Sequence, residues 1–203
     1  MVATLQEDAW MEKCFIAICP IGGTEKSYHG LTETVDIDPG EKGIEGIPLV
    51  NGGRIRRWSP QTDGEITFEA YPIFAGTDSG STGKGFFDLM HAADASTPIR
   101  IPNDFNRTKH RIAILWTNDT TVSSATTSTT NTYSGFRFVC ADAIITSVKA
   151  SFTDGVLKFT ITAKWTAFDK NASANAIYES CEGSGAGDIL PALAAYTSSY
   201  KFS

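Results

Sequence analysis

The sequence predicts a mainly β protein, a sandwich or barrel of short strands with one flanking α-helix. Three observations support this fold class. Apolar and polar residues alternate over several stretches, as in strands with one buried and one exposed face. An Asp-Gly pair at 154–155 joins two such stretches, which is typical of a β-hairpin. One segment, residues 86–95, has apolar residues three and four positions apart, as in an amphipathic helix.

The segment 136–169 contains the clearest pattern. After the Asp-Gly pair, the apolar residues fall on every second position: Leu157, Phe159, Ile161, Ala163, Trp165 and Ala167. The residues between them are polar: Lys158, Thr160, Thr162, Lys164 and Thr166. Before the pair, apolar residues share one parity from Ile144 to Phe152, with Thr146 as the exception. We expect a hairpin with one apolar face, and because a lone hairpin is marginally stable, other strands must cover that face.

The first third of the chain predicts strands separated by one long connection. The apolar run 14–18 indicates a buried strand, and the alternation over 33–37 indicates a second. Residues 39–53 contain five glycines and two prolines, so we expect a long exposed connection with a possible strand over 47–50. Residues 55–58 are predicted to form a strand that re-enters the core.

The middle of the chain predicts two more strands around the helix. Residues 65–71 alternate, with Ile66, Phe68 and Ala70 on one face. A glycine-rich loop over 76–85 precedes the helix at 86–95. Residues 111–117 are apolar on both faces, so that strand is expected to be central or covered.

The rest of the chain is richer in small polar residues. Twelve of the eighteen residues at 117–134 are Ser or Thr, which predicts a mobile loop or a β-rich excursion that orders only against a neighbour. A short helix is possible over 189–196. We therefore expect one β domain over residues 1–170 and a C-terminal extension over 171–203.

Composition excludes some classes of function. Seventeen basic and twenty-three acidic residues give a net charge of −6, which argues against a protein that grips nucleic acid by its phosphates. The four cysteines match no zinc spacing and are expected to be buried free thiols. No apolar run approaches the roughly 20 residues that cross a bilayer, so we expect no membrane insertion.

No motif predicts catalysis, a cofactor or a metal. The loop before the helix resembles a P-loop, but Asp78 and Gly85 stand where that motif needs Gly and Ser or Thr. Asp36, Asp38 and Glu41 resemble half a calcium loop, yet Gly40 and Glu41 break its spacing. The three histidines are scattered, and no nucleophile, base and oxyanion donor come together. The sequence therefore predicts a protein that is not an enzyme.

A basic and aromatic cluster lies at 52–58. In so acidic a chain, we expect its arginines to pair with acidic residues of a neighbouring copy. Trp58, Trp116 and Trp165 could instead form a carbohydrate-binding platform, but Trp116 and Trp165 lie on apolar strand faces.

Taken together, the order of elements resembles a tail tube (major tail) protein of tailed viruses of bacteria and archaea. The segment 46–54 leading into 63–72 looks like that family's long connection and following strand. The runs 144–148 and 154–161 are similar to its final hairpin. The resemblance spans about residues 10–170, and the segments 117–134 and 171–203 depart from it.

The resemblance implies hexameric rings that stack as a helical assembly into a hollow tube, each subunit adding a sheet to an inner barrel. The helix would pack outside this barrel. The 39–53 connection would bridge rings through Glu41, Ile44, Ile47, Leu49, Arg54, Arg56 and Arg57. The polar strand face with Lys158, Thr160, Thr162 and Lys164 would line the lumen. Its two lysines count against a purely acidic lumen, unless they pair with carboxylates of the adjacent strand.

The implied function is that of a structural virion protein, in a tail assembled in the host cytoplasm. Double-stranded DNA would pass through the lumen without specific binding during genome ejection. Implied partners are the tape-measure, baseplate and terminator proteins, and a sheath if the tail is contractile. The alternatives are a decoration protein of similar architecture, a secretion-apparatus tube subunit of the same fold, and a carbohydrate-binding β-sandwich.

Overall fold

The computed structural model describes residues 13–23, 25–29, 32–71 and 108–197, and these contain ten strands. The strands are β1 (Lys13–Pro20), β2 (Lys26–His29), β3 (Thr32–Asp38), β4 (Lys42–Pro48), β5 (Arg54–Gln61), β6 (Gly64–Ala70), β7 (His110–Thr117), β8 (Gly135–Thr153), β9 (Val156–Trp165) and β10 (Ala176–Cys181). No helix occurs among these residues, so none there could span a membrane. The predicted helix at 86–95 lies outside the described residues.

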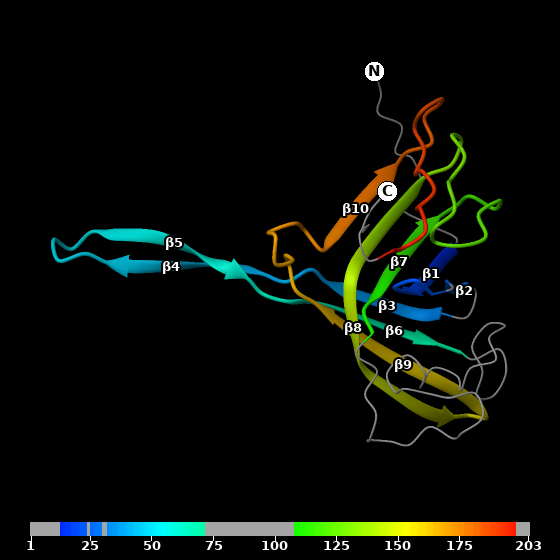
Figure 1. The fold of residues 1–203 in the computed structure, drawn as a ribbon, viewed down its shortest axis with the longest axis horizontal. Coiled ribbons are helices and arrows are strands. Elements are labelled where there is room, and N and C mark those ends of the chain that lie inside the picture. Colours follow the sequence, from blue (N-terminus) through cyan, green and yellow to red (C-terminus); the bar gives the residue numbers. More distant parts are fainter. Residues whose placement is uncertain (1–12, 24, 30–31, 72–107, 198–203) are drawn as a thin grey trace.

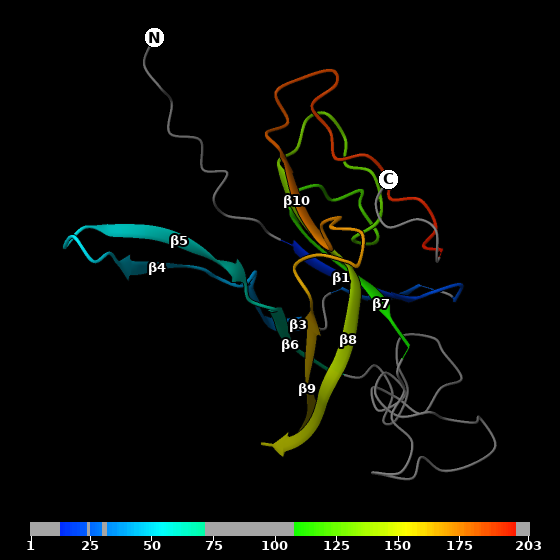
Figure 2. The same cartoon turned by 60° about the vertical axis from the view of Figure 1, so that its left-hand side comes forward.

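The long strand β8 belongs to two layers (Figures 1 and 2). Its first half pairs with β7 on one side and with β10 on the other. Its second half pairs with β9, after a register shift between Ile145 and Ser147. Sheet A therefore has the order β2-β1-β7-β8-β10, and sheet B has the order β8-β9-β6-β3. Because β8 bends from one layer into the other, the whole sheet curls into a half-barrel.

The main core lies between the two sheets. Sheet B contributes the apolar face of β6, with Ile66 and Phe68, and that of β9, with Phe159 and Ile161. Burial alternates strictly along β6, as the sequence predicted. Fully burying each such Ile or Phe side chain stabilises the fold by about 1.5–3 kcal/mol. The predicted hairpin at 154–155 is confirmed, with Gly155 at φ 81°.

The central strands of sheet A, which are β1, β7 and the first half of β8, are buried on both faces. This burial confirms the prediction for residues 111–117. The outer face of sheet A packs through Phe15, Leu115 and Val139 against side chains of the covering segments. These covering residues are Val122, Ala125 and Leu190, and Cys181 at the end of β10 belongs to the same cluster. The cover consists of the Ser/Thr-rich segment and the chain after β10. Residues 189–196 form neither helix nor strand, so the expected short helix is absent; Leu193 N instead donates to Thr126 O at 3.0 Å.

The Ser/Thr-rich segment forms an irregular loop around one buried carboxylate, Asp119. Its Oδ1 accepts from the backbone N and hydroxyl of Thr121, at 2.8 and 2.6 Å. Its Oδ2 accepts from the same two groups of Thr130, at 2.7 and 3.0 Å. Burial acts to raise the pKa of Asp119, but these hydrogen bonds outweigh it and hold the pKa below its usual value. The loop contains few apolar residues, and hydrogen bonds between its buried polar groups stabilise it instead.

Asp119→Ala should lower the free energy of unfolding by about 2–4 kcal/mol, because buried N–H groups lose their acceptor. Folding lowers the pKa of Asp119, so its carboxylate contributes to the free energy of unfolding only while it is ionised. This contribution is complete above the unfolded pKa of about 3.9 and is lost as the pH falls through the folded pKa. Urea unfolding between pH 7 and pH 2 measures both effects. Exposed Asp36→Ala is the control, and an equal loss in both variants would contradict this role.

The cysteines are free. Cys19, Cys140 and Cys181 are buried, as predicted, whereas Cys14 is half-buried. Burial raises the pKa of Cys14 to about 12, which keeps it a thiol at neutral pH.

Candidate assembly surfaces

The β4–β5 hairpin projects from the body as a separate arm (Figure 1). It leaves sheet B between β3 and β6 and belongs to a two-stranded sheet of its own. Its base is tied by hydrogen bonds: Thr62 N donates to Glu41 O at 3.0 Å, and Glu41 N donates to Thr62 Oγ1 at 2.8 Å. At the tip, Gly52 adopts φ 82°, which glycine permits without a steric penalty.

The prediction that residues 55–58 re-enter the core is wrong. Ile55 is 53% exposed and Trp58 is 66% exposed, because no other described strand faces the arm. The two apolar residues Ile55 and Trp58 lie three positions apart, so neither face of β5 is continuously apolar.

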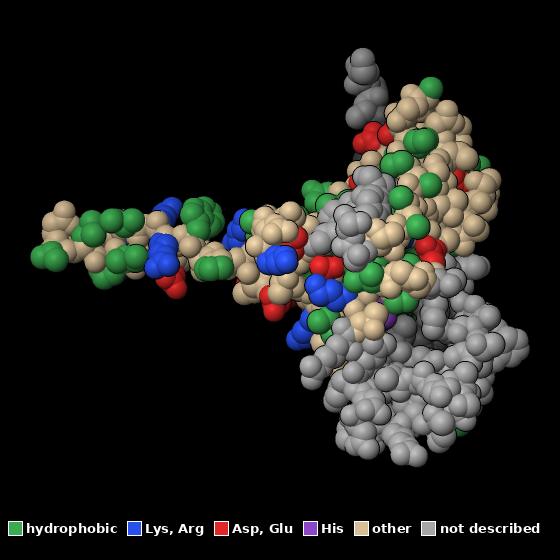
Figure 3. Space-filling model, in the orientation of Figure 1, with side chains coloured by type: hydrophobic (Ala, Val, Ile, Leu, Met, Phe, Trp, Pro, Cys, Tyr) green, Lys and Arg blue, Asp and Glu red, His purple; other side chains and the backbone are tan. Residues whose placement is uncertain are grey.

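Register assigns the arm residues to two faces, because directly opposed residues of an antiparallel pair share a face. The Trp58 face holds the pairs Ile44–Trp58, Gly46–Arg56 and Pro48–Arg54. The Ile47 face holds the pairs Ile47–Ile55 and Glu45–Arg57. Both faces therefore expose apolar side chains, together with arginines (Figure 3). A bare two-stranded hairpin is marginally stable, so this arm suits a contact with a partner.

The structure brings the seven residues assigned to the connection onto this arm. Glu41 lies at the base, Ile44 and Ile47 in β4, Leu49 at the tip, and Arg54, Arg56 and Arg57 in β5. All seven are exposed. Sequence reasoning missed Ile55, Trp58 and the tip residue Val50 as parts of the same surface.

The outer face of sheet B is polar and internally paired. Lys158 Nζ lies 3.0 Å from Glu69 Oε2, and Lys164 Nζ lies 2.9 Å from Glu65 Oε2. Between these ion pairs, the hydroxyls of Thr67 and Thr162 lie 3.2 Å apart. The expected pairing of both lysines with the adjacent strand is thus confirmed. The hydrogen bond to Glu65 and its charge raise the pKa of Lys164.

Sheet B has two open edges within the part of the chain that the structure describes. β3 ends the strand order on one side. On the other side, β10 covers β8 only as far as Cys140, so residues 144–153 have no second neighbour. Exposed apolar side chains lie on this second edge strand, with Ile144 at 41% and Phe152 at 71%. Open edges invite pairing with another chain.

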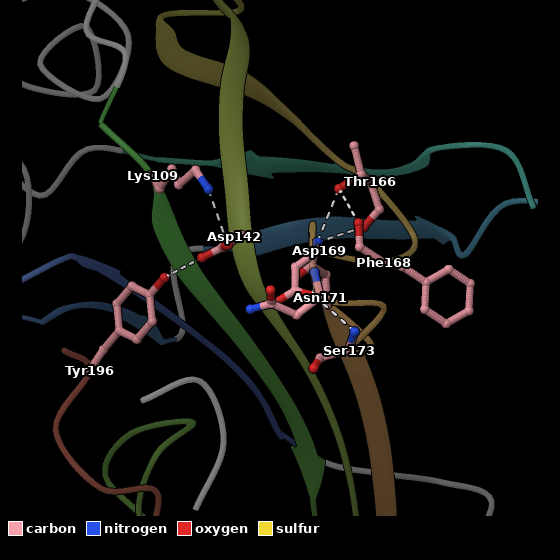
Figure 4. A network of polar contacts seen from close by, with 9 residues as sticks. Lys109, Asp142, Thr166, Phe168, Asp169, Asn171, Ser173 and Tyr196 are labelled. Carbon is pink, nitrogen blue, oxygen red and sulfur yellow. Dashed lines mark hydrogen bonds and ion pairs between the residues drawn. The ribbon is translucent and has the colours of Figure 1, made fainter. Parts of the chain in front are cut away.

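A hollow of about 830 Å³ lies beside this edge, near the base of the arm. Near it, Asp142 accepts from Lys109 at 3.2 Å and from the hydroxyl of Tyr196 at 2.6 Å. Burial and the Asp142 carboxylate raise the pKa of Tyr196. Asp169 accepts from the backbone N of Asn171 and Ser173, while the ring of Phe168 points away (Figure 4).

These polar groups connect loops and strands that are distant in sequence. Among the described residues, no trio of His, Cys, Asp or Glu has the spacing of a metal site. Trp165 is buried, and Trp116 packs on Phe136 with ring centroids 5.4 Å apart. Of the three tryptophans considered for a carbohydrate platform, Trp58 is the exposed one.

Solved structures show what the fold is similar to, whereas no protein-family model and no curated protein matches the chain. The sheath/tube terminator of the extracellular contractile injection system PVC is 13% identical, with a TM-score of 0.54 over 87% of this chain and 99% of that one. The PVC sheath-tube complex contains a chain that is 15% identical, with a TM-score of 0.47 over 81% of this chain and 87% of that one. The Hcp1 protein of E. coli EAEC 042 is 11% identical, with a TM-score of 0.36 over 84% of this chain and 98% of that one. The first similarity confirms the predicted tube-type fold.

Proposed function

We propose that this chain is a structural subunit that assembles as stacked hexameric rings into a tail tube, the conduit for genome ejection. The observation that supports this most is the form of sheet B: a polar, paired outer face between two open edges. Joining such sheets edge to edge around a ring would close a barrel and remove the open edges. The fold shared with a sheath/tube terminator supports the same reading.

In this proposal, the polar face of sheet B lines the lumen. Lys158, Thr160, Thr162 and Lys164 would then face passing DNA. Because both lysines are paired with glutamates, the face offers few free cations to phosphates, and DNA can slide. The arm would bridge rings. The tape-measure, baseplate and terminator proteins, and a sheath in a contractile tail, are the proposed partners in a virion tail assembled in the host cytoplasm. No catalytic role is proposed.

Electron microscopy and light scattering of the concentrated protein test the proposal. Hollow tubes or six-membered rings are the expected particles. A protein that stays monomeric at every concentration, with or without a baseplate complex as nucleus, would contradict the proposal. A carbohydrate-binding module would also stay monomeric, and its affinity for carbohydrate would fall on Trp58→Ala.

A terminator is the second candidate, because the best-supported similarity is to a sheath/tube terminator that the chain covers almost completely. A terminator would form single rings that do not lengthen with concentration. A tube subunit, whether of a virus or of a secretion apparatus, would form tubes whose length rises with concentration.

Glu65→Gln with Glu69→Gln should turn the lumen face into one that holds DNA. The change removes the two carboxylates that pair with Lys158 and Lys164, so phosphates can take their place. We expect about tenfold more double-stranded DNA to co-sediment with assembled tubes at low salt, and the excess to vanish at high salt. The matched control adds Lys158→Gln and Lys164→Gln. Equal DNA retention in both variants would place this face away from the lumen.

A further inference from the structure

The arm and its base have opposite charges. Arg54, Arg56 and Arg57 lie along β5, and an acidic collar of Asp36, Asp38, Glu41 and Asp63 surrounds the base. All seven side chains are exposed, and none forms an ion pair within the described residues. Lys164, which lies close enough to Asp63 to feel its charge, is already paired with Glu65.

The arm cannot neutralise its own collar. Strand β4 has seven residues and is about 23 Å long at roughly 3.3 Å per residue. Arg54 lies opposite Pro48, at the distal end of that strand, and Arg56 lies opposite Gly46. A paired hairpin does not fold back on itself over this length, so the distal arginines remain far from the collar of the same copy. An ion pair between these distal arginines and a collar would therefore have to join two molecules.

The collar adjoins an apolar surface that matches one face of the arm. Asp63 lines both an acidic hollow, shared with Asp36 and Asp38, and the larger hollow at the arm base. The larger hollow exposes Ile144 and Phe168, at 41% and 48%. The Trp58 face of the arm combines apolar Ile44 and Trp58 with basic Arg54 and Arg56. The lining of the larger hollow also contains Lys109, Lys164 and Lys170, so its charges are mixed and the acidic part of the site is the smaller hollow with the collar. Acidic and apolar groups thus lie side by side at the base of an apolar and basic arm.

We propose that the Trp58 face of one copy's arm docks on the acidic collar and adjoining hollow of a second copy. Arg54 and Arg56 pair there with collar carboxylates, while apolar arm side chains cover Ile144 and Phe168. The inference rests on the proposed function, in which copies assemble, and it identifies the receiving surface. Because each copy both offers an arm and receives one, such contacts propagate from copy to copy.

Charge reversal tests this pairing with four forms of the full chain. The arm variant is Arg54→Glu with Arg56→Glu, and the collar variant is Asp38→Lys with Asp63→Lys. The third form combines all four changes. The control is Lys13→Glu with Ser123→Glu and Asn131→Glu, which makes the same change of net charge as the arm variant at sites outside the arm, the collar and the adjoining hollow.

Each single-surface variant should raise the concentration needed for assembly about tenfold or more, because like charges then face each other. An equimolar mixture of the two variants should assemble, since each arm then meets an oppositely charged collar. The combined form should assemble alone, and the control should behave as the wild type. Sedimentation velocity at low salt measures association, and circular dichroism confirms folding.

Association that is unchanged in the arm variant would overturn the inference. So would a mixture and a combined form that stay monomeric although folded. If the wild type forms tubes and the variants assemble equally well, the proposed function is retained and only the contact between arm and collar is ruled out. Wild-type monomers would count against the proposed function, while binding between the two variants would still decide whether arm and collar pair.

Discussion

Replacement of residues 42–61 by a two-residue Asn-Gly turn should leave a folded protein that no longer forms tubes. Glu41 and Thr62 already face each other through two hydrogen bonds, so a short hairpin turn can join them. No residue of the arm belongs to either core cluster. We therefore expect the free energy of unfolding to change by less than about 1 kcal/mol.

Assembly into tubes, in contrast to stability, should be lost when the arm is removed. Without the arm, rings lose the surface proposed to bridge them, and electron microscopy should show single rings or monomers at concentrations where the wild type forms tubes. Circular dichroism and urea unfolding of the same samples establish that the body is intact. A suitable control changes only the tip, with Val50→Ser, and should retain assembly if the bridge lies along the strands. Long tubes formed without the arm, or an unfolded body, would show that the arm is not the bridge.

Glu179→Ala should cause the largest loss of stability, about 3–5 kcal/mol, because it leaves a buried charge without its partner. Arg137 is completely buried on the outer face of sheet A, opposite Leu115 in the β7 ladder. Its Nε donates to Glu179 Oε1 at 2.8 Å, and a second guanidinium nitrogen donates to the carbonyl of Pro191. One side chain therefore joins β8, β10 and the C-terminal cover.

The comparison variant is Arg137→Met with Glu179→Ala, which removes the buried charge as well. An apolar side chain of similar length should recover a large part of the loss, because the cost arises from burying an unpaired charge. Urea unfolding of the single and double variants measures the difference. If both variants lose the same free energy of unfolding, the packing of the C-terminal cover depends on the shape of the arginine side chain and not on its charge.

The alternating residues determined much of the fold. Period-two patterns placed β3, β6 and β9, and the same parity separated Phe159 in the core from Lys158 and Lys164 on the polar face. Pairing of those lysines followed from their parity, because a polar strand face next to a glutamate-bearing strand brings opposite charges together. These features are local, and a strand's own sequence contains them.

Other features depended on which surfaces meet. Ile55 and Trp58 are apolar and were expected to enter the core, yet no described layer faces them, so the arm could only be recognised in three dimensions. Arg137 stands in an apolar run, and only its contacts with Glu179 and Pro191 explain how a charge can be buried there. Likewise, the Ser/Thr-rich segment is ordered by Asp119 hydrogen bonds and by packing on sheet A. Sequence patterns thus determined the strands and the residues on each face. Contacts between distant segments decided which of these faces are covered. The physical reason is that the burial of a strand face depends on the partner that packs against it as well as on the strand itself.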